Sequence, residues 1–331
     1  MIDRRTFIAG AAAAASLAPG RQAFGQAATP VLGWPTRTVR SIIPSAPGGP
    51  GENYRIYLDH FRETFGQGFV LENQPGASGS IGSLNVKRAA PDGHTLLCAA
   101  NSHVILAPLV APKPTFDVKQ DFVPIGVIIT YPFCLIVNAD LPVKNVRELV
   151  AYAKERPGQL NFGSIGIGTG GHLVAELFVK RAGIKAQHIP YTGAPAQVQG
   201  VAGGTLQFTV DTIGNSRGAM EAGKIRQIAV TGAQRSPAAP NLPTFAEEGF
   251  EGFEFGLWLG LLGPLATPQP VVQALNREIA RCGAKPDVKA KLLGAAYAPS
   301  EGSPADFAAL IDRELALWST VVRETGVKIP G

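Results

Sequence analysis

The sequence predicts an α/β protein with two lobes and a cleft between them. Apolar strand-like runs alternate with helical patterns, and this alternation occurs twice along the 331 residues. Strands that are joined by helices run parallel in one sheet. The chain is expected to cross between the two units near residues 130 and 230. Two crossings at matching depth predict that the second unit is inserted into the first, as in a hinged two-lobed protein.

The first lobe is expected to comprise residues 36–130 and 231–328. Its early part follows the order β-α-β-α-β, in which one helical pattern ends at Gly66. The expected elements are a strand at 38–44, a helix at 54–66, a strand and turn at 68–76, a helix at 79–93 and a strand at 94–101.

The second lobe is expected at residues 131–230 and repeats this order. Its first helix is well marked, because Asn145 can cap it and Glu148 follows three residues later. Two apolar runs, 122–130 and 133–140, are expected to connect the lobes. The other expected elements are helices at 145–158, 172–183 and 194–204 and strands at 160–164, 186–193, 206–212 and 225–232.

A long helix is expected at the C-terminal end of the first lobe. Ser303 can cap it, Pro304 suits its first turn, and Asp306 favours the positive end of the helix dipole. A stripe of apolar residues at helical spacing predicts that one face packs on the core. This stripe consists of Leu310, Ile311, Leu315, Trp318 and Val322.

Residues 1–27 are typical of an export signal rather than of a folded domain. Arg4 and Arg5 are adjacent, Phe7 follows, and a weakly apolar Ala-rich run leads to small residues. This pattern indicates the twin-arginine type and predicts a periplasmic location. The alternative is an Ala-rich structural helix. The mature protein is expected to be soluble, because no later segment has about 18 uninterrupted apolar residues. The pattern does not define the cleavage site.

Composition and charge disfavour several classes of protein. Hydrophobic residues make up 45% and charged residues 17%, which is ordinary for a globular chain with sizeable cores. The formal net charge of +5 falls to +3 without the signal, which carries three arginines and one aspartate (5 − 3 + 1). Because lysines and arginines are scattered, nucleic-acid binding has little support.

The three cysteines do not have the spacing of a metal site. Cys98 and Cys134 lie in strand-like apolar runs, which favours buried free thiols. A disulfide between two of Cys98, Cys134 and Cys282 stays open, because the periplasm is oxidising. Since the chain has five histidines and no Cys/His cluster, neither a metal site nor a cofactor is expected.

A glycine-rich loop, GSIGIGTGGH at 163–172, joins a predicted strand to a predicted helix. Gly166, Gly168 and Gly171 match G-x-G-x-x-G, the pattern of dinucleotide-binding loops. The acid that such a fold needs about 20 residues later is missing, because Tyr191 stands there with no acid nearby. The same glycines suit a smaller anion such as a carboxylate, since backbone N–H groups can form a concave nest. The other interpretation is a tight structural turn.

A second glycine-rich loop, PSAPGGPGEN at 44–53, also follows a strand and precedes a helix. A third loop, YTG at 191–193, carries two hydroxyl groups. In open α/β sheets, ligands bind at the carboxyl ends of the strands. Loops of this kind in both lobes therefore favour a binding site over isolated structural turns.

At this point several motifs resemble a known family, the periplasmic solute receptors of tripartite tricarboxylate transporters, also called the Bug family. The matching motifs follow the family order along essentially the whole mature chain. They are PSAPGGPGE, VLENQPGASGSIG, AAPDGHTLL, LPVKNVRELVAYAKERPGQLNFGSIGIGTGGHLVAELF, IPYTGAPAQVQGVAGG, PNLPTFAEEGFEGFE and the terminal LWSTVVRETGVK.

The resemblance implies a Venus-flytrap fold of the type II-like periplasmic binding proteins, in which each lobe is a sheet flanked by helices. It implies a small organic carboxylate as ligand and delivery to the subunits of a membrane permease, with the receptor a monomer. The first loop departs from the family pattern. Ser45 replaces an aromatic residue, and Pro50, Gly51 and Glu52 follow the two glycines.

The expected ligand site combines loops from both lobes. We expect the loop before 172–183 to hold one carboxylate, the loop at 191–193 to assist, and the first lobe to close over the ligand through its glycines, in part through water. The expected ligand-binding residues are Ser45, Gly48, Gly49, Asn101, Ser102, Ser164, Gly168, Thr169, Gly170, His172, Tyr191, Thr192, Gly193 and Asp211.

Three of the side chains near this site have two interpretations each. His172 either touches the ligand or packs at the helix start. Asp211 either accepts from a ligand hydroxyl or ammonium group or braces the Tyr191 loop, and it would repel a second carboxylate. Trp258 either forms a wall of the pocket or lies in the core.

An exported enzyme is the competing class of function. A hydrolase nucleophile needs G-x-S-x-G, and the residues around Ser78, Ser80 and Ser164 do not fit this pattern. No catalytic residue is therefore expected. A third possibility is a receptor that presents its ligand to a membrane kinase. The sequence does not separate that role from transport, and it does not name the carboxylate.

Overall fold

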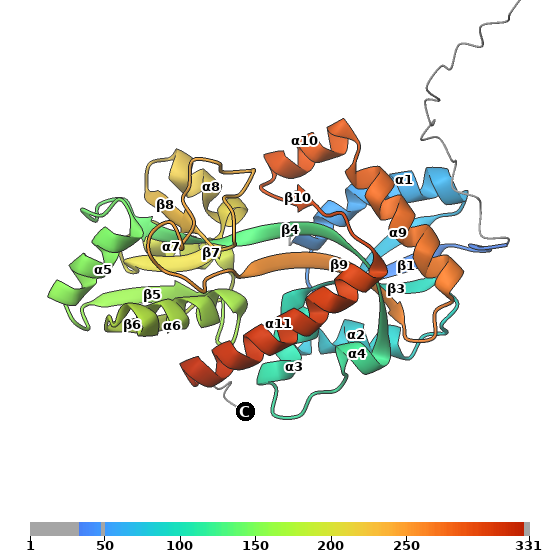
Figure 1. Cartoon of the computed structure of the whole chain (residues 1–331), viewed down its shortest axis with the longest axis horizontal. Coiled ribbons are helices and arrows are strands. Elements are labelled where there is room, and N and C mark those ends of the chain that lie inside the picture. The colour runs from blue at the N-terminus through green and yellow to red at the C-terminus, as the bar shows by residue number, and fades with distance from the viewer. Residues whose placement is uncertain (1–32, 48–49, 328–331) are drawn as a thin grey trace, which may run out of the picture.

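The computed structural model describes residues 33–47 and 50–327. The predicted export signal lies outside these residues, as do Gly48 and Gly49. The described chain folds into two α/β lobes that share one ten-stranded mixed sheet (Figure 1). The strands follow the order β2-β1-β3-β9-β4-β7-β5-β6, and β8 and β10 also pair with β4. The predicted two-lobed α/β fold is therefore confirmed.

The first lobe is built on a small parallel sheet with an antiparallel strand beside it. Strand β1 pairs in parallel with β2 and β3, and β3 pairs antiparallel with β9. The strands are β1 (Val39–Ile43), β2 (Phe69–Asn73), β3 (Thr95–Ala100), β9 (Gly256–Pro264) and the short β10 (Ala298–Pro299). The helices are η1 (Pro50–Tyr54), α1 (Arg55–Phe65), η2 (Ala77–Gly79), α2 (Ser80–Lys87), η3 (Ser102–Leu106), α3 (Ala107–Val110), α4 (Val118–Asp121), α9 (Gln269–Gly283) and α10 (Pro286–Gly294).

The second lobe repeats the strand-helix alternation that the sequence predicted. Strand β5 pairs in parallel with β6 and β7, and β7 and β8 pair antiparallel with the far half of β4. The strands are β5 (Leu160–Ser164), β6 (Ala186–Pro190), β7 (Phe208–Thr212) and β8 (Ile225–Val230). The helices are α5 (Val146–Glu155), α6 (Gly170–Ala182), α7 (Ala194–Ala202) and α8 (Ile213–Glu221).

The two apolar runs that were expected to connect the lobes form one long strand, and β9 is the second connection between the lobes. Strand β4 (Phe122–Asn138) has 17 residues and runs along the long axis of the molecule beside β9 (Figure 1). Its first part pairs with β9, and its last five residues pair with β8. Pro132, which lies between the two runs, is opposite Gly256 at the start of β9, where a missing N–H donor is tolerated.

The segment after β8 packs on the second lobe. The backbone N–H of Phe245 donates to Val230 O (3.0 Å), and the rings of Phe245 and Phe250 contact Phe178 of α6. The chain returns to the first lobe in β9, which begins at Gly256. Apolar burial along this segment explains its position, since its aromatic side chains complete the core over α6.

The last helix, α11 (Pro304–Thr325), touches both lobes and crosses the face of the molecule diagonally (Figure 1). The side chains of Ser303 and Asp306 form the capping box at its start. Ile311 and Trp318 of the predicted stripe are buried, while the other members are half-buried against the core. Near its end, the Glu324 carboxylate pairs with Arg181 of α6 (3.2 Å).

The three cysteines are buried free thiols in the structure. Burial raises the pKa of each thiol, so none of them has thiolate character at neutral pH. Among the described helices, none is both long and apolar enough to cross a membrane.

The packing on β9 can be tested with two glycines of the same strand. A Cβ at Gly260 would lie 2.3 Å from the Phe307 ring and 3.2 Å from Trp258, whereas a Cβ at Gly256 would meet nothing within 4 Å. Gly260→Ala is therefore expected to lower the free energy of unfolding by about 1–3 kcal/mol, as overpacked cores do. Gly256→Ala should leave it nearly unchanged. Urea denaturation measures both, and equal effects would contradict this packing.

Candidate functional site

A cavity of about 550 Å³ lies between the lobes. The first lobe contributes the ends of β1 and β3 and the turn at 75–79, and the second lobe contributes the ends of β5 and β7. Its floor is formed where β4 and β9 link the lobes, at Tyr131, Phe133 and Leu257. Parallel strands thus place their carboxyl ends around one cavity, as expected from the fold.

The loop between β5 and α6 forms one wall of the cavity. Gly166 (φ +150°) and Gly168 (φ +79°) adopt backbone conformations that other residues rarely take. Ile165 and Ile167 line the cavity and are each about two-fifths exposed. On the inner side, the Thr169 hydroxyl donates to Gly166 O (2.8 Å), which fixes the turn.

The amino terminus of α6 opens into this cavity without a cap. Thr169 is its N-cap residue, but its hydroxyl is bonded to the preceding loop and caps no helix N–H. The first N–H bonded within the helix is that of Leu173, which donates to Thr169 O (3.0 Å). The N–H groups of Gly170 and Gly171, which line the cavity, are thus left without a helix acceptor. They form the positive end of a 13-residue helix.

The two glycines at this terminus let the helix lie deep in the lobe. A Cβ at Gly171 would lie 2.5 Å from the Val210 carbonyl oxygen, and one at Gly170 would lie 2.7 Å from the Phe133 ring. The close approach explains why glycine follows glycine here. It also brings the helix terminus next to the end of β7, where Asp211 follows Val210.

The structure brings some of the expected site residues to the cavity and places others behind it. Those that line the cavity are Ser45, Ser102, Gly168, Thr169, Gly170 and Asp211. Those that do not line it are Asn101, Ser164, His172, Tyr191, Thr192 and Gly193. Gly48 and Gly49 lie outside the described residues.

The residues behind the cavity have structural partners. The amide of Asn101 is fully buried and donates to Glu314 Oε2 and to Gly256 O, both at 3.0 Å. Ser164 is also fully buried and is bonded to His188 (2.7 Å). Trp258 lies in the core against Phe307, with ring centroids 5.0 Å apart.

The loop at 191–193 runs beside the loop between β5 and α6. The Tyr191 N–H donates to Ser164 O (2.8 Å), and its hydroxyl lies against Gly200 of α7. Gly193 is the N-cap residue of α7, with φ +91°. The tyrosine therefore packs between the ends of β5 and α7.

One part of the cavity wall was missed by the sequence analysis. The turn at 75–79 contributes Ser78, which adopts a left-handed conformation (φ +53°) that non-glycine residues seldom take. His103 of η3 lies beside Gly79 and also lines the cavity, and it follows β3 directly after two of the expected site residues, Asn101 and Ser102. The sequence signal that could have indicated this turn is PGASG, in which two glycines flank a pair of small residues.

Asp211 is the acidic residue of the cavity wall. Its Oδ1 accepts from the Thr212 N–H (2.7 Å) and the Asn215 amide (2.9 Å), while the buried Oδ2 has no partner. Burial raises the pKa of this carboxyl to about 6. Burial also lowers the pKa of His103 to about 4, so this imidazole is neutral at pH 7. Among the described residues, no lysine or arginine lines the cavity.

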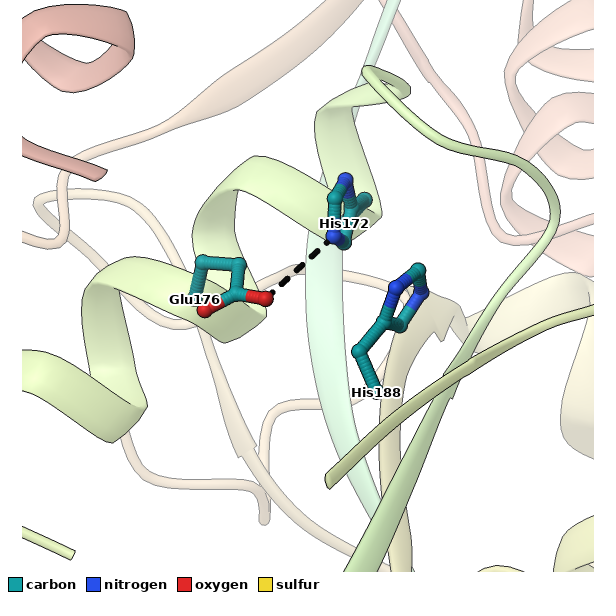
Figure 2. Close-up of side chains that lie close together, drawn as sticks. All are labelled: His172, Glu176 and His188. Carbon is teal, nitrogen blue, oxygen red and sulfur yellow. Dashed lines mark ion pairs between the residues drawn. The ribbon is translucent and has the colours of Figure 1, made fainter. Parts of the chain in front are cut away.

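Behind the loop, His172, Glu176 and His188 form a cluster whose ligand-type atoms lie within 4.8 Å of one another (Figure 2). Such side chains can hold a divalent metal. Here, however, Nδ1 of His172 accepts the Gly168 N–H (3.0 Å), so its proton is on Nε2, the atom that faces Glu176 (3.4 Å). The two imidazoles are stacked with centroids 3.9 Å apart, and stacked rings do not direct their lone pairs to one point. This chemistry favours a scaffold over a metal centre.

Comparison with known proteins identifies the family. Residues 54–327 match the family described as "Tripartite tricarboxylate transporter family receptor". The chain belongs to this family. The resemblance seen in the sequence motifs is confirmed, and the protein is a solute-binding receptor rather than an enzyme.

Relatives and solved structures agree with this assignment. A UPF0065 protein of Pseudomonas sp. (strain P51) is 33% identical over 98% of this chain and 95% of its own, and Protein BugT of Bordetella pertussis is 30% identical over 89% and 91%. The structure "R. palustris Rpa4515 with adipate" has a TM-score of 0.80, 34% identity and coverage of 89% and 99%. MatC of Rhodopseudomonas palustris "with bound malate" has a TM-score of 0.75, 29% identity and coverage of 87% and 100%.

The burial of Asp211 predicts a gain of stability on its neutralisation. A carboxyl whose pKa is raised from 3.8 to about 6 destabilises the folded receptor above pH 6, and this penalty disappears as the pH falls toward 3.8. Asp211→Asn should therefore raise the free energy of unfolding at pH 7.5 by up to about 3 kcal/mol. The exposed Asp59→Asn is the control. Thermal denaturation at several pH values measures the difference, and a destabilised Asp211→Asn protein at pH 7.5 would refute the argument.

Proposed function

We propose that this receptor binds a small organic carboxylate at the uncapped amino terminus of α6. The single observation that carries the proposal is that this terminus opens into the cavity between the lobes. Free N–H groups and the positive dipole end favour a carboxylate at such a place. The hydroxyl groups of Ser45 and Ser102 on the facing lobe supply further neutral donors. The adipate and malate bound to the two neighbours support the same class of ligand.

Neutral donors suit a receptor that must release its ligand. Desolvation of N–H and hydroxyl groups costs less than burial of a lysine or arginine. Much of the remaining wall is apolar, with Ile165, Ile167, Leu106 and Leu257 around the cavity. These side chains would cover the carbon skeleton of the ligand while its carboxylate lies at the helix terminus.

A thermal-shift screen against carboxylates, followed by calorimetry, tests the proposal. The panel contains adipate, malate, citrate, succinate, benzoate and amino acids, with NAD as the decoy. A ligand at a hundredfold excess over its Kd should stabilise the receptor by about 2.7 kcal/mol. Thr169→Asp is expected to weaken carboxylate binding by roughly tenfold or more, because its own carboxylate would cap α6.

Thr169→Ser keeps the hydroxyl and is the matched control, with affinity close to that of the wild type. Carboxylates that bind equally well to the Thr169→Asp protein would remove the helix terminus from the site. Stabilisation by NAD alone would refute carboxylate binding.

We also propose how the two lobes divide. The expected division assigns 36–130 and 231–328 to the first lobe and 131–230 to the second. The contacts of Phe245 and Phe250 with α6 favour moving 231–255 to the second lobe. The lobes would then close on the ligand by bending of β4 and β9.

We propose that the loaded receptor is a periplasmic monomer that delivers its ligand to the subunits of a tripartite-type membrane permease. The family assignment supports this role. Uptake of the identified ligand by cells should then require both the receptor and a permease pair. Uptake that is unaffected by deletion of the receptor would favour presentation to a membrane kinase instead.

Export by the twin-arginine route is tested on the signal itself. Arg4→Lys together with Arg5→Lys should leave the precursor in the cytoplasm, because the route requires the arginine pair. The matched control, Arg21→Lys, should be exported normally. Cell fractionation followed by immunoblotting measures the two pools. Normal export of the double variant would indicate the general secretion route.

A further inference from the structure

The loop at 165–169, between β5 and α6, lines the cavity and is called here the ligand-facing loop. Its inner side is held by two histidines from different elements. His172 lies in the first turn of α6, and His188 lies on β6 (Figure 2). His172 is 3% exposed, although it is a polar side chain next to the cavity wall. Neither histidine lines the cavity. Their polar atoms are therefore available to the loop rather than to a ligand.

Each histidine holds a different half of the loop. Nδ1 of His172 accepts the Gly168 N–H at 3.0 Å. Nε2 of His188 is bonded to the Ser164 hydroxyl at 2.7 Å, and this hydroxyl donates to Gly166 O at 3.0 Å. The left-handed conformation of Gly168 and the extended turn at Gly166 are thus fixed from behind by imidazole groups.

Stacking joins the two halves into one unit. The imidazole centroids are 3.9 Å apart with an interplanar angle of 24°, and the centroid of the His188 ring also lies 5.1 Å from that of Phe162. Rotation of either ring would break the stack as well as its hydrogen bond. The pair therefore fixes the position of the loop relative to the first turn of α6.

This arrangement requires His172 to be neutral. A proton on Nδ1 would face the Gly168 N–H and replace a hydrogen bond with a repulsion. The charged group that faces the pair is Glu176 of α6, whereas the contacts from β5, Phe162 and Ser164, are uncharged. Burial, with a smaller effect from His172, lowers the pKa of His188 to about 4, so His188 is uncharged at neutral pH despite Glu176.

We propose that His172 and His188 are a positioning pair that holds the ligand-facing loop in its binding geometry and releases it when His172 takes up a proton. The pair acts through Gly168 and Ser164 and does not contact the ligand. Acidification thus disorders the loop that leads into the α6 terminus. The effect of acidification on ligand affinity rests on the proposed carboxylate site, whereas the effect of acidification on the loop does not.

Nuclear magnetic resonance on the ligand-free receptor tests the pair directly. Imidazole ¹⁵N shifts at pH 7.5 should show His172 unprotonated at Nδ1 and protonated at Nε2. The Gly168 amide should lose protection from hydrogen exchange by about tenfold in His172→Leu, which removes the acceptor. His172→Asn keeps an acceptor near the Nδ1 position and should restore protection. It should also abolish the loss of Gly168 protection that we expect in the wild type on acidification.

The melting temperature and the near-ultraviolet circular dichroism of each variant exclude a general loss of folding. If His172→Leu does not fold, the pH profile of His172→Asn decides. His188→Gln, which can keep the bond to Ser164, should retain the Gly166 turn but loosen the stack. An Nδ1-protonated His172 at pH 7.5, or a pH-dependent loss of Gly168 protection in His172→Asn, would overturn the proposal.

The adipate affinity of the Asp211→Asn protein, measured at several pH values, then separates the effect of the histidine pair from that of the Asp211 carboxyl. Adipate affinity that falls on acidification in this background, and stays constant when His172→Asn is added, supports the proposal. The same fall in both proteins would overturn it. If adipate does not bind at all while the exchange results hold, the choice of ligand class fails and the positioning pair stands.

Discussion

The pairing of β4 with β9 is the contact on which the rest of the architecture depends. These strands carry the chain out of the first lobe and back, and they pair antiparallel from Phe122 to Pro132. A parallel sheet grows on each side of them, which sets the carboxyl ends of β1 and β3 opposite those of β5 and β7. The cavity lies where this pair changes lobes. Its position follows from strand topology, and the loops only decide its chemistry.

The chemistry of the cavity is that of neutral dipoles in an apolar surrounding. The amino terminus of α6 offers N–H groups, and the wall of the cavity is mostly aliphatic and aromatic. Asp211 adds a carboxyl whose burial already raises its pKa. A ligand is therefore selected by where it places its negative charge, since one end of the cavity attracts an anion and the neighbouring end of β7 repels it.

The sequence predicted the order of elements well, because apolar periodicity and caps are local signals. The caps at Asn145 and at Ser303 occur where the sequence indicated. It did not predict which polar residues near the cavity are satisfied from behind. The partner of Asn101 is Glu314, more than two hundred residues away, and such a contact leaves no mark in a local pattern. The same holds for Ser164, whose partner His188 comes from the next strand. The sequence also did not predict that the chain returns to the first lobe at the start of β9. The reason is that the aromatic residues of 245–253 pack on α6, which is far from them in the chain.

The lack of a cationic side chain in the described cavity wall also bears on how fast a ligand is captured. A fixed charge attracts anions over a distance comparable with the Debye length, about 8 Å at physiological ionic strength. The field of a helix terminus falls off within its first turn. Association of an anion with this receptor would therefore be governed by diffusion and by opening of the lobes rather than by long-range attraction. Salt would screen only the repulsion from the ionised Asp211, so dilute surroundings would not raise the rate at which this receptor collects an anionic solute.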